Sequence, residues 1–242
     1  MVTMARKRGG GGGRQRARQR AQYDELDKYP VMPPHAFARI VRDKQTLNII
    51  YQIIEPPLTK KEQEQRDEIM DIFIRSLTAN IEEIDSNPEA YVRTAMDKVI
   101  KSYSMKINKK SKSKLFYYLR RDLIGYGKMD VLMNDVNVED ISLDGTNIPI
   151  FAYHRKFESV ETTCVWETDD ELESYVIKLA QRCGKHISVA EPLLDATLMD
   201  GSRIVMKLGH EISTRGSAFC IRRFKDDPFS PADIVAFRTM SS

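Results

Sequence analysis

A change in hydrophobic period near Gly127 constrains this chain more than any other feature of its sequence. Between residues 59 and 126, apolar side chains recur every three or four positions, and that spacing is typical of helices that bury one face. Short runs with alternating apolar and polar residues follow: 138–143, 148–153 and 160–166. Alternation of this kind is typical of half-buried strands. The sequence therefore predicts a helical region followed by a β-rich region, which is an α+β organisation.

The helical region carries recognisable start signals. Thr59 and Glu62 have the spacing of a capping box, and the apolar positions after them predict a helix of about 25 residues. A second helix is expected from Pro88, after the capping residue Asn87. The lysine-rich segment 108–114 is interpreted as a solvated connector to a third helix. Before these helices, two extended segments bracketed by Pro-Pro pairs predict a β-hairpin, 35–42 and 47–54.

The β-rich region is expected to form a mixed sheet of about five strands with a helix packed on it. Two further strands are predicted at 203–208 and 218–224. A capping box at Thr168 begins the helix, and Gly184 can end it. The segment around Asp195 is interpreted as irregular, and Ser230 is expected to open a final helix.

Four segments follow from this pattern. We expect a disordered Gly/Arg tail at 1–28, a hairpin with the helical module at 29–126, an α+β domain at 127–228 and the start of a linker helix at 229–242. Residues 1–22 hold seven basic residues and no acid, so the remainder has 31 basic against 35 acidic residues. Such a tail can contact the phosphates of nucleic acid or anionic lipid by charge alone.

Several classes of protein and site are not supported by the sequence. It has no apolar run long enough to span a membrane and no secretory signal, so we expect a cytoplasmic protein. Three widely spaced cysteines, Cys164, Cys183 and Cys220, predict reduced core thiols rather than disulfides or a zinc site. No histidine pair has metal-ligand spacing. The only Gly-Lys pairs are Gly127-Lys128 and Gly184-Lys185, and neither fits a phosphate-binding loop, so the chain is not expected to hydrolyse ATP alone.

Three arginines in the β-rich region are the candidate binding residues. Arg203 lies in MDGSR, Arg215 in STRGS and Arg222 in FCIRRF. A guanidinium offers a planar fork of donors for phosphate oxygens. From spacing alone, however, ion pairs with nearby acids are favoured: Glu191, Asp195, Asp200 or Glu211.

Residues 123–145 and 180–224 resemble the N-terminal region of the type II/IV secretion system ATPases. The local patterns IGYGK, CGKHIS and RGSAFCIRRF are most similar to the archaeal branch that drives archaella and type IV pili. The resemblance implies a domain that adjoins the nucleotide site and lends arginines to the phosphates. Arg215 and Arg222 match the family's RG-x-x-x-x-x-R pattern, and Arg203 matches its DGSR arginine.

The resemblance also implies partners and cofactors. It implies ATP and Mg²⁺ in the complete protein, a homo-hexamer whose own ATPase domain follows Ser242, a membrane platform protein, and a location at the inner face of the cell membrane. Hydrolysis would be coupled to a push on the platform protein, and the module at 59–126 is the natural contact for it. Two alternatives remain: a nucleic-acid-binding protein that uses its Arg-rich tail, or a stand-alone adaptor without ATPase activity. An in-frame phosphate-binding loop downstream of codon 242 would separate the motor from the adaptor.

Overall fold

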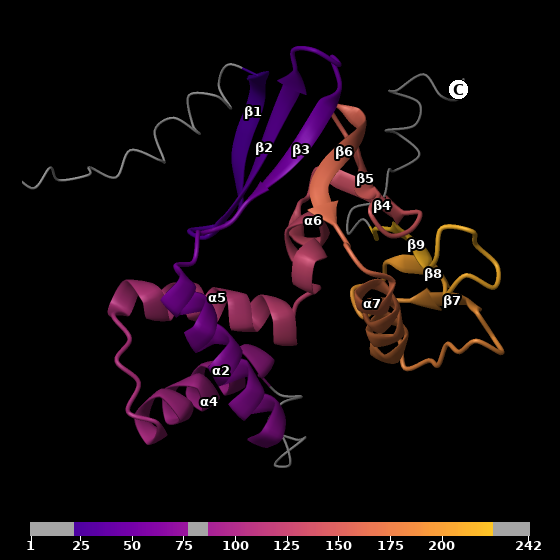
Figure 1. Ribbon diagram of the computed structural model, residues 1–242. Coiled ribbons are helices and arrows are strands. Elements are labelled where there is room, and N and C mark those ends of the chain that lie inside the picture. Colours follow the sequence, from indigo (N-terminus) through magenta and orange to yellow (C-terminus); the bar gives the residue numbers. More distant parts are fainter. Residues whose placement is uncertain (1–21, 77–86, 225–242) are drawn as a thin grey trace, which may run out of the picture. The chain divides into compact units, whose positions relative to one another are not determined.

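The computed structural model describes residues 22–76 and 87–224, and these form two compact units (Figure 1). The first unit takes in the chain up to residue 136 together with residues 160–164. The second unit takes in residues 137–159 and the chain from residue 165. The expected helix at Ser230 and the expected tail up to residue 21 lie outside the described residues.

The strands of the first unit include the expected hairpin. Their bounds are β1 (Tyr23–Met32), β2 (Ala36–Asp43), β3 (Ile49–Ile54) and β6 (Glu158–Val165), of which residues 160–164 belong to this unit. Strands β1, β2 and β3 pair antiparallel in chain order, and β3 pairs parallel with β6. Strand β1 begins inside the segment that was expected to belong to the tail. Its partners explain the difference, because β1 pairs with β2 along most of its length and such non-local pairing leaves little trace in local composition.

Three helices of the first unit share one apolar core. Their bounds are α2 (Lys60–Ser76), α4 (Pro88–Ser102) and α5 (Lys109–Leu123). The buried core residues are Ile69, Phe73, Val92, Met96, Val99, Leu115 and Leu119. The first five carry the predicted three- and four-residue spacing, whereas Tyr103, expected on the same face of α4, is 57% exposed because it follows the last turn of that helix. The capping signals are confirmed, since the Thr59 N–H donates to Glu62 Oε2 at 2.8 Å and Asn87 accepts the N–H of Ala90.

The interpretation of residues 108–114 as a connector was wrong, because α5 begins inside that segment. The Asn108 side chain accepts the N–H of Ser111 at 2.7 Å and caps the helix. The Ser111 hydroxyl then donates to Glu62 Oε1 at 2.6 Å, and the Lys114 ammonium lies 3.4 Å from Glu62 Oε2. The polar residues of this helical turn are therefore held by a carboxylate of α2, a contact that hydrophobic periodicity cannot show.

The second unit is an antiparallel sheet with one helix. Between α5 and this sheet the first unit ends with a 3₁₀ turn, η1 (Gly127–Met129), and α6 (Asp130–Asn134). The strands of the second unit are β4 (Val138–Leu143), β5 (Pro149–His154), β7 (Leu193–Thr197), β8 (Arg203–Lys207) and β9 (Ala218–Arg222). Their order is β5-β4-β9-β8-β7. Strand β7 lies in the segment that was interpreted as irregular.

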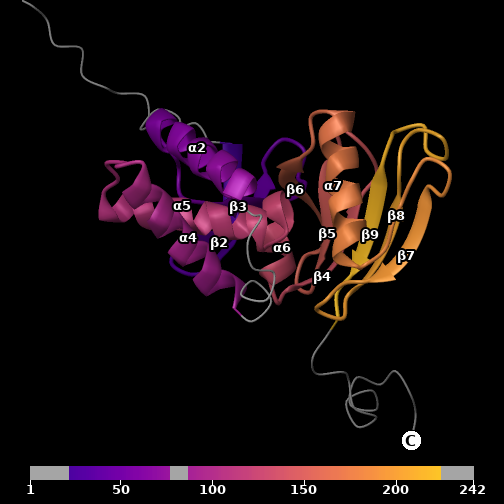
Figure 2. The ribbon, with the colours of Figure 1, turned by 90° about the horizontal axis from the view of Figure 1, so that it is seen from below.

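Helix α7 (Asp169–Arg182) covers one face of that sheet, as Figure 2 shows. It begins at the predicted cap, where Thr168 accepts the N–H of Glu171. Its buried stripe includes Leu172, Val176 and Leu179, and the ring of Tyr175 lies 6.1 Å from the ring of Phe219 on β9. The side chains of β9 that alternate with Phe219 must then lie on the face away from α7.

The α+β class is confirmed, with more strands than expected. The described residues contain nine strands, whereas the sequence predicted two in the hairpin and about five in the β-rich region. The parallel β3–β6 pair makes the sheet mixed. Within the described residues, none of the helices has the length and apolarity needed to cross a membrane.

Candidate functional site

Arg203 and Arg222 lie directly opposite each other on the neighbouring strands β8 and β9. On β9, Phe219 and Ile221 are buried whereas Arg222 is exposed. On β8, Ile204 is buried and Arg203 is exposed. Because side chains alternate along strands, both guanidinium groups lie on the face that α7 does not cover. We call this surface of β4, β9, β8 and β7 the open face.

Each of these arginines has a carboxylate partner on the strand beside it. Arg222 Nε donates to Asp140 Oδ1 on β4 at 3.0 Å, and Arg203 Nη2 donates to Asp195 Oδ2 on β7 at 3.2 Å. The ion pair with Asp195 was among those favoured by spacing, whereas Asp140 was missed. Like charges that lie opposite each other on neighbouring strands repel. The carboxylates of Asp140 and Asp195 offset the repulsion between Arg222 and Arg203.

The two guanidinium groups remain accessible to a ligand. The Arg222 side chain is 80% exposed and that of Arg203 is 72% exposed, so water screens both ion pairs. The hydrogen bond with Asp140, and then the charge of that carboxylate, raises the pKa of Arg222 above its usual value. At this position the open face therefore presents two guanidinium groups, and each has the planar fork that suits a phosphate group.

Arg215 lies at the other end of β9. It is exposed in the loop between β8 and β9, three residues before the strand begins, whereas Arg222 is the last residue of that strand. The Arg215 carbonyl oxygen accepts the N–H of Thr146 at 3.4 Å, and a side chain at Gly145 would collide with that oxygen. The structure thus brings Arg203 and Arg222 together and places Arg215 apart from them.

The structure contains a polar cluster near Arg215 that the sequence did not predict, made of Thr146, Asp169 and His210. The Thr146 hydroxyl donates to Asp169 Oδ1 at the start of α7, and His210 Nε2 lies 3.2 Å from Asp169 Oδ2. The hydrogen bond from Thr146, and then that from His210, lowers the pKa of Asp169. Gly216 has a φ of +85°, and a Cβ there would lie 3.2 Å from Asp169 Oδ1. In the sequence, the one sign that the backbone at residue 216 lies close to Asp169 is the glycine of the RGS motif, because glycine has no side chain to obstruct the contact.

The other candidate chemistries find little support in the described residues. They contain no group of three or more His, Cys, Asp or Glu residues arranged to hold a metal ion. The prediction of core thiols holds for Cys164, which is buried, and is wrong for Cys220, which is exposed on the open face beside Arg222. Partial desolvation raises the pKa of the Cys220 thiol, which disfavours its thiolate form.

Sequence relatives of the chain come from an archaeon, and their functions are not known. No family model matches the chain. The uncharacterized protein MJ1288 of Methanocaldococcus jannaschii is 41% identical over 164 residues, which cover 67% of this chain and 65% of that protein. The uncharacterized protein MJ0900 of the same organism is 30% identical over 219 residues, which cover 89% of this chain and 38% of that protein. The chain therefore spans less than two thirds of either relative.

The solved structures that show a partial likeness include the VirB11 ATPase from the Brucella suis type IV secretion system in complex with sulphate. The TM-score is 0.40 and the identity is 15%, over 52% of this chain and 36% of that chain. This likeness concerns the fold of part of the chain.

Proposed function

We propose that this chain is the N-terminal region of an archaeal secretion, pilus or archaellum-assembly ATPase, and that its open face meets the phosphates of a nucleotide. The observation that carries the proposal is the exposed Arg203–Arg222 pair. These arginines belong to the DGSR and RG-x-x-x-x-x-R patterns of the family that the sequence resembles.

The pair suits a terminal phosphate better than a single arginine does. Phosphate oxygens can replace the carboxylates of Asp140 and Asp195 as acceptors, because the forks of Arg203 and Arg222 are held on one face. In this proposal the two arginines act together, and Arg215 makes a separate contact from the other end of β9.

The proposal includes a motor built from several subunits. ATP and Mg²⁺ would bind in the complete protein, a homo-hexamer would place the open face against the ATPase domain, and a change at the γ-phosphate would move that domain against this region. The helical module at 59–126, which holds α2, α4 and α5, is the proposed contact for a membrane platform protein, at the inner face of the cell membrane.

The test is ATP hydrolysis by the complete protein with single substitutions on the open face. We expect Arg203→Ala and Arg222→Ala each to lower kcat at least tenfold, because each removes a charge-assisted contact that the transition state strengthens. Lys207→Ala is the matched control, since Lys207 is exposed on the same face of β8 but is four residues from Arg203.

Two outcomes would contradict the proposal. One is a pair of arginine variants that hydrolyse ATP as fast as the Lys207 control. The other is a stop codon directly after codon 242 in the gene, which would favour the adaptor instead.

A further inference from the structure

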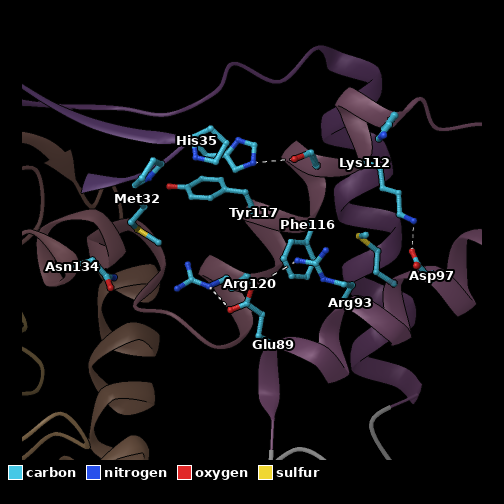
Figure 3. A pocket seen from close by; sticks show the side chains of 15 residues that line it. Met32, His35, Glu89, Arg93, Asp97, Lys112, Phe116, Tyr117, Arg120 and Asn134 are labelled. Atoms are coloured by element: carbon cyan, nitrogen blue, oxygen red, sulfur yellow. Dashed lines mark hydrogen bonds and ion pairs between the residues drawn. The ribbon is translucent and has the colours of Figure 1, made fainter. Parts of the chain in front are cut away.

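A hollow of about 740 Å³ opens within the first unit, away from the arginines of the open face. Its walls are one stripe of α4, one stripe of α5, the turn of residues 32–35 that joins β1 to β2, and Asn134 at the end of α6 (Figure 3). Small-molecule sites occupy roughly 300–1,000 Å³. The hollow is therefore large enough for a ligand of nucleotide size, and we call it the helical pocket.

The helical pocket is positively charged. Four cationic side chains line it, against the two carboxylates of Glu89 and Asp97: Arg93, Lys109, Lys112 and Arg120. Burial lowers the pKa of His35, so its imidazole stays neutral near pH 7. This excess of positive charge lies in a chain whose residues after the tail hold more acids than bases. An anion is thus the ligand that the pocket attracts.

Two arginines converge on one carboxylate without forming close hydrogen bonds to it. Arg93 lies 3.9 Å and Arg120 lies 3.6 Å from the oxygens of Glu89. Arg120 also lies 3.8 Å from Asp130, whose side chain is buried. Hydrogen bonds to a carboxylate are about 2.7–2.9 Å long, so Glu89 holds the two guanidinium groups near each other only loosely. A phosphate has more oxygens and more charge, and it can bridge both.

The remaining wall of the helical pocket is apolar and aromatic. The Arg93 guanidinium lies 4.2 Å from the centre of the Phe116 ring, which is a cation–π arrangement. Met32, Met96 and Tyr117 line the same hollow. The lining therefore combines charged donors with surface for a flat, weakly polar group.

We propose that the helical pocket binds a small organic phosphate of nucleotide size, with its phosphate between Arg93 and Arg120 and its ring against Met32, Phe116 and Tyr117. Inorganic phosphate would use only the charged part of this site, and a nucleoside would use only the apolar part. The site shares no residue with the open face, so it is independent of the proposed ATPase role.

The experiment is isothermal titration of this chain with a panel of AMP, GMP, UMP and flavin mononucleotide. We expect at least one of them to bind with a Kd at least tenfold below those of the matching nucleoside and of inorganic phosphate. Failure of all four to bind at millimolar concentration would overturn the proposal.

Single substitutions then locate the bound molecule. Arg93→Gln and Arg120→Gln should each weaken binding at least tenfold, and Arg93→Lys should weaken it less because it keeps the charge without the fork. Lys110→Gln is the matched control, because Lys110 is exposed on α5 and does not line the pocket. Circular dichroism melts check that each variant is folded.

The position of the phosphate separates this proposal from the ATPase role. Binding that is lost in Arg222→Gln but kept in Arg93→Gln and Arg120→Gln would place the molecule on the open face and would refute the helical pocket.

Discussion

At the scale of single residues, Asp135 is a buried carboxylate that joins several elements of the first unit. It is 1% exposed, and the hydroxyls of Tyr29 and Tyr51 each donate to its Oδ2 at 2.6 Å. A buried carboxylate is costly unless such donors satisfy it. Burial, and then the charge of Asp135, raises the pKa of Tyr51, so this phenol stays a donor. One carboxylate therefore links β1, β3 and the end of α6.

Tyr51→Phe should lower the free energy of unfolding by about 2 kcal/mol, because it removes a hydrogen bond to a buried charge. Urea denaturation followed by circular dichroism measures the change. Tyr103→Phe is the control, since Tyr103 is 57% exposed and should lose almost nothing. Equal stability of the two variants would refute this role of Asp135.

The candidate site could be predicted from the sequence only in part. The motifs indicated Arg203 and Arg222, and Asp195 was near enough in sequence to be expected as a partner. Asp140 lies 82 residues from Arg222, and only the register of β4 against β9 brings them together. Arg215 matches the same motif as Arg222, yet the strand between them separates the two side chains, which motif spacing alone does not reveal.

At the scale of elements, Glu62 joins the starts of two helices. It completes the capping box of α2 and accepts the hydroxyl of Ser111 on α5. The hydrogen bonds from Ser111 and from the Thr59 backbone, followed by weaker contributions that include the charge of Lys114, lower the pKa of Glu62 to about 2. The ionised form of Glu62 thus stabilises the folded state.

Because the folded pKa of Glu62 lies below its ordinary value of 4.5, its contribution is present above that pH and is lost as the pH falls toward about 2. Thermal melts from pH 6 to pH 2 should show that Glu62→Gln is less stable than the unmodified chain at pH 6. The difference should shrink through this window. Glu64→Gln, at an exposed position of the same helix, is the control. A difference that is constant with pH would contradict the assignment.

Elements with a strong local signal were predicted well, and those held by distant partners were not. Helices α4 and α7 have caps and apolar stripes, and both appear where expected. Strand β7 shows little alternation that predicts a strand, and it exists through its pairing with β8. The first turns of α5 are rich in lysine, and they are stabilised by Asn108 and Glu62 rather than by apolar burial.

At the scale of the whole molecule, the charge of the chain is divided unevenly along its length. The seven basic residues of 1–22 outweigh the excess of acids in the remainder, so the whole chain has a formal net charge of +3. Attraction to polyanions should therefore depend on this segment.

The chain should elute from a heparin column at higher salt than a version that lacks residues 1–22. Charge attraction to a polyanion weakens as salt rises, and the shortened chain has a net negative charge. The elution salt concentration is the measurement. Equal retention of both versions would assign the attraction to the lysines of α5 and its surroundings instead.

The bond between Glu62 and Ser111 also sets an order of events during synthesis. The two residues are 49 positions apart, so the first turn of α2 leaves the ribosome well before its partner on α5. Until α5 has been made and docked, the Glu62 carboxylate lacks the Ser111 hydroxyl as a donor. The capping box with Thr59 can form early, and docking of the third helix then adds the Ser111 hydroxyl as a further donor to the same carboxylate.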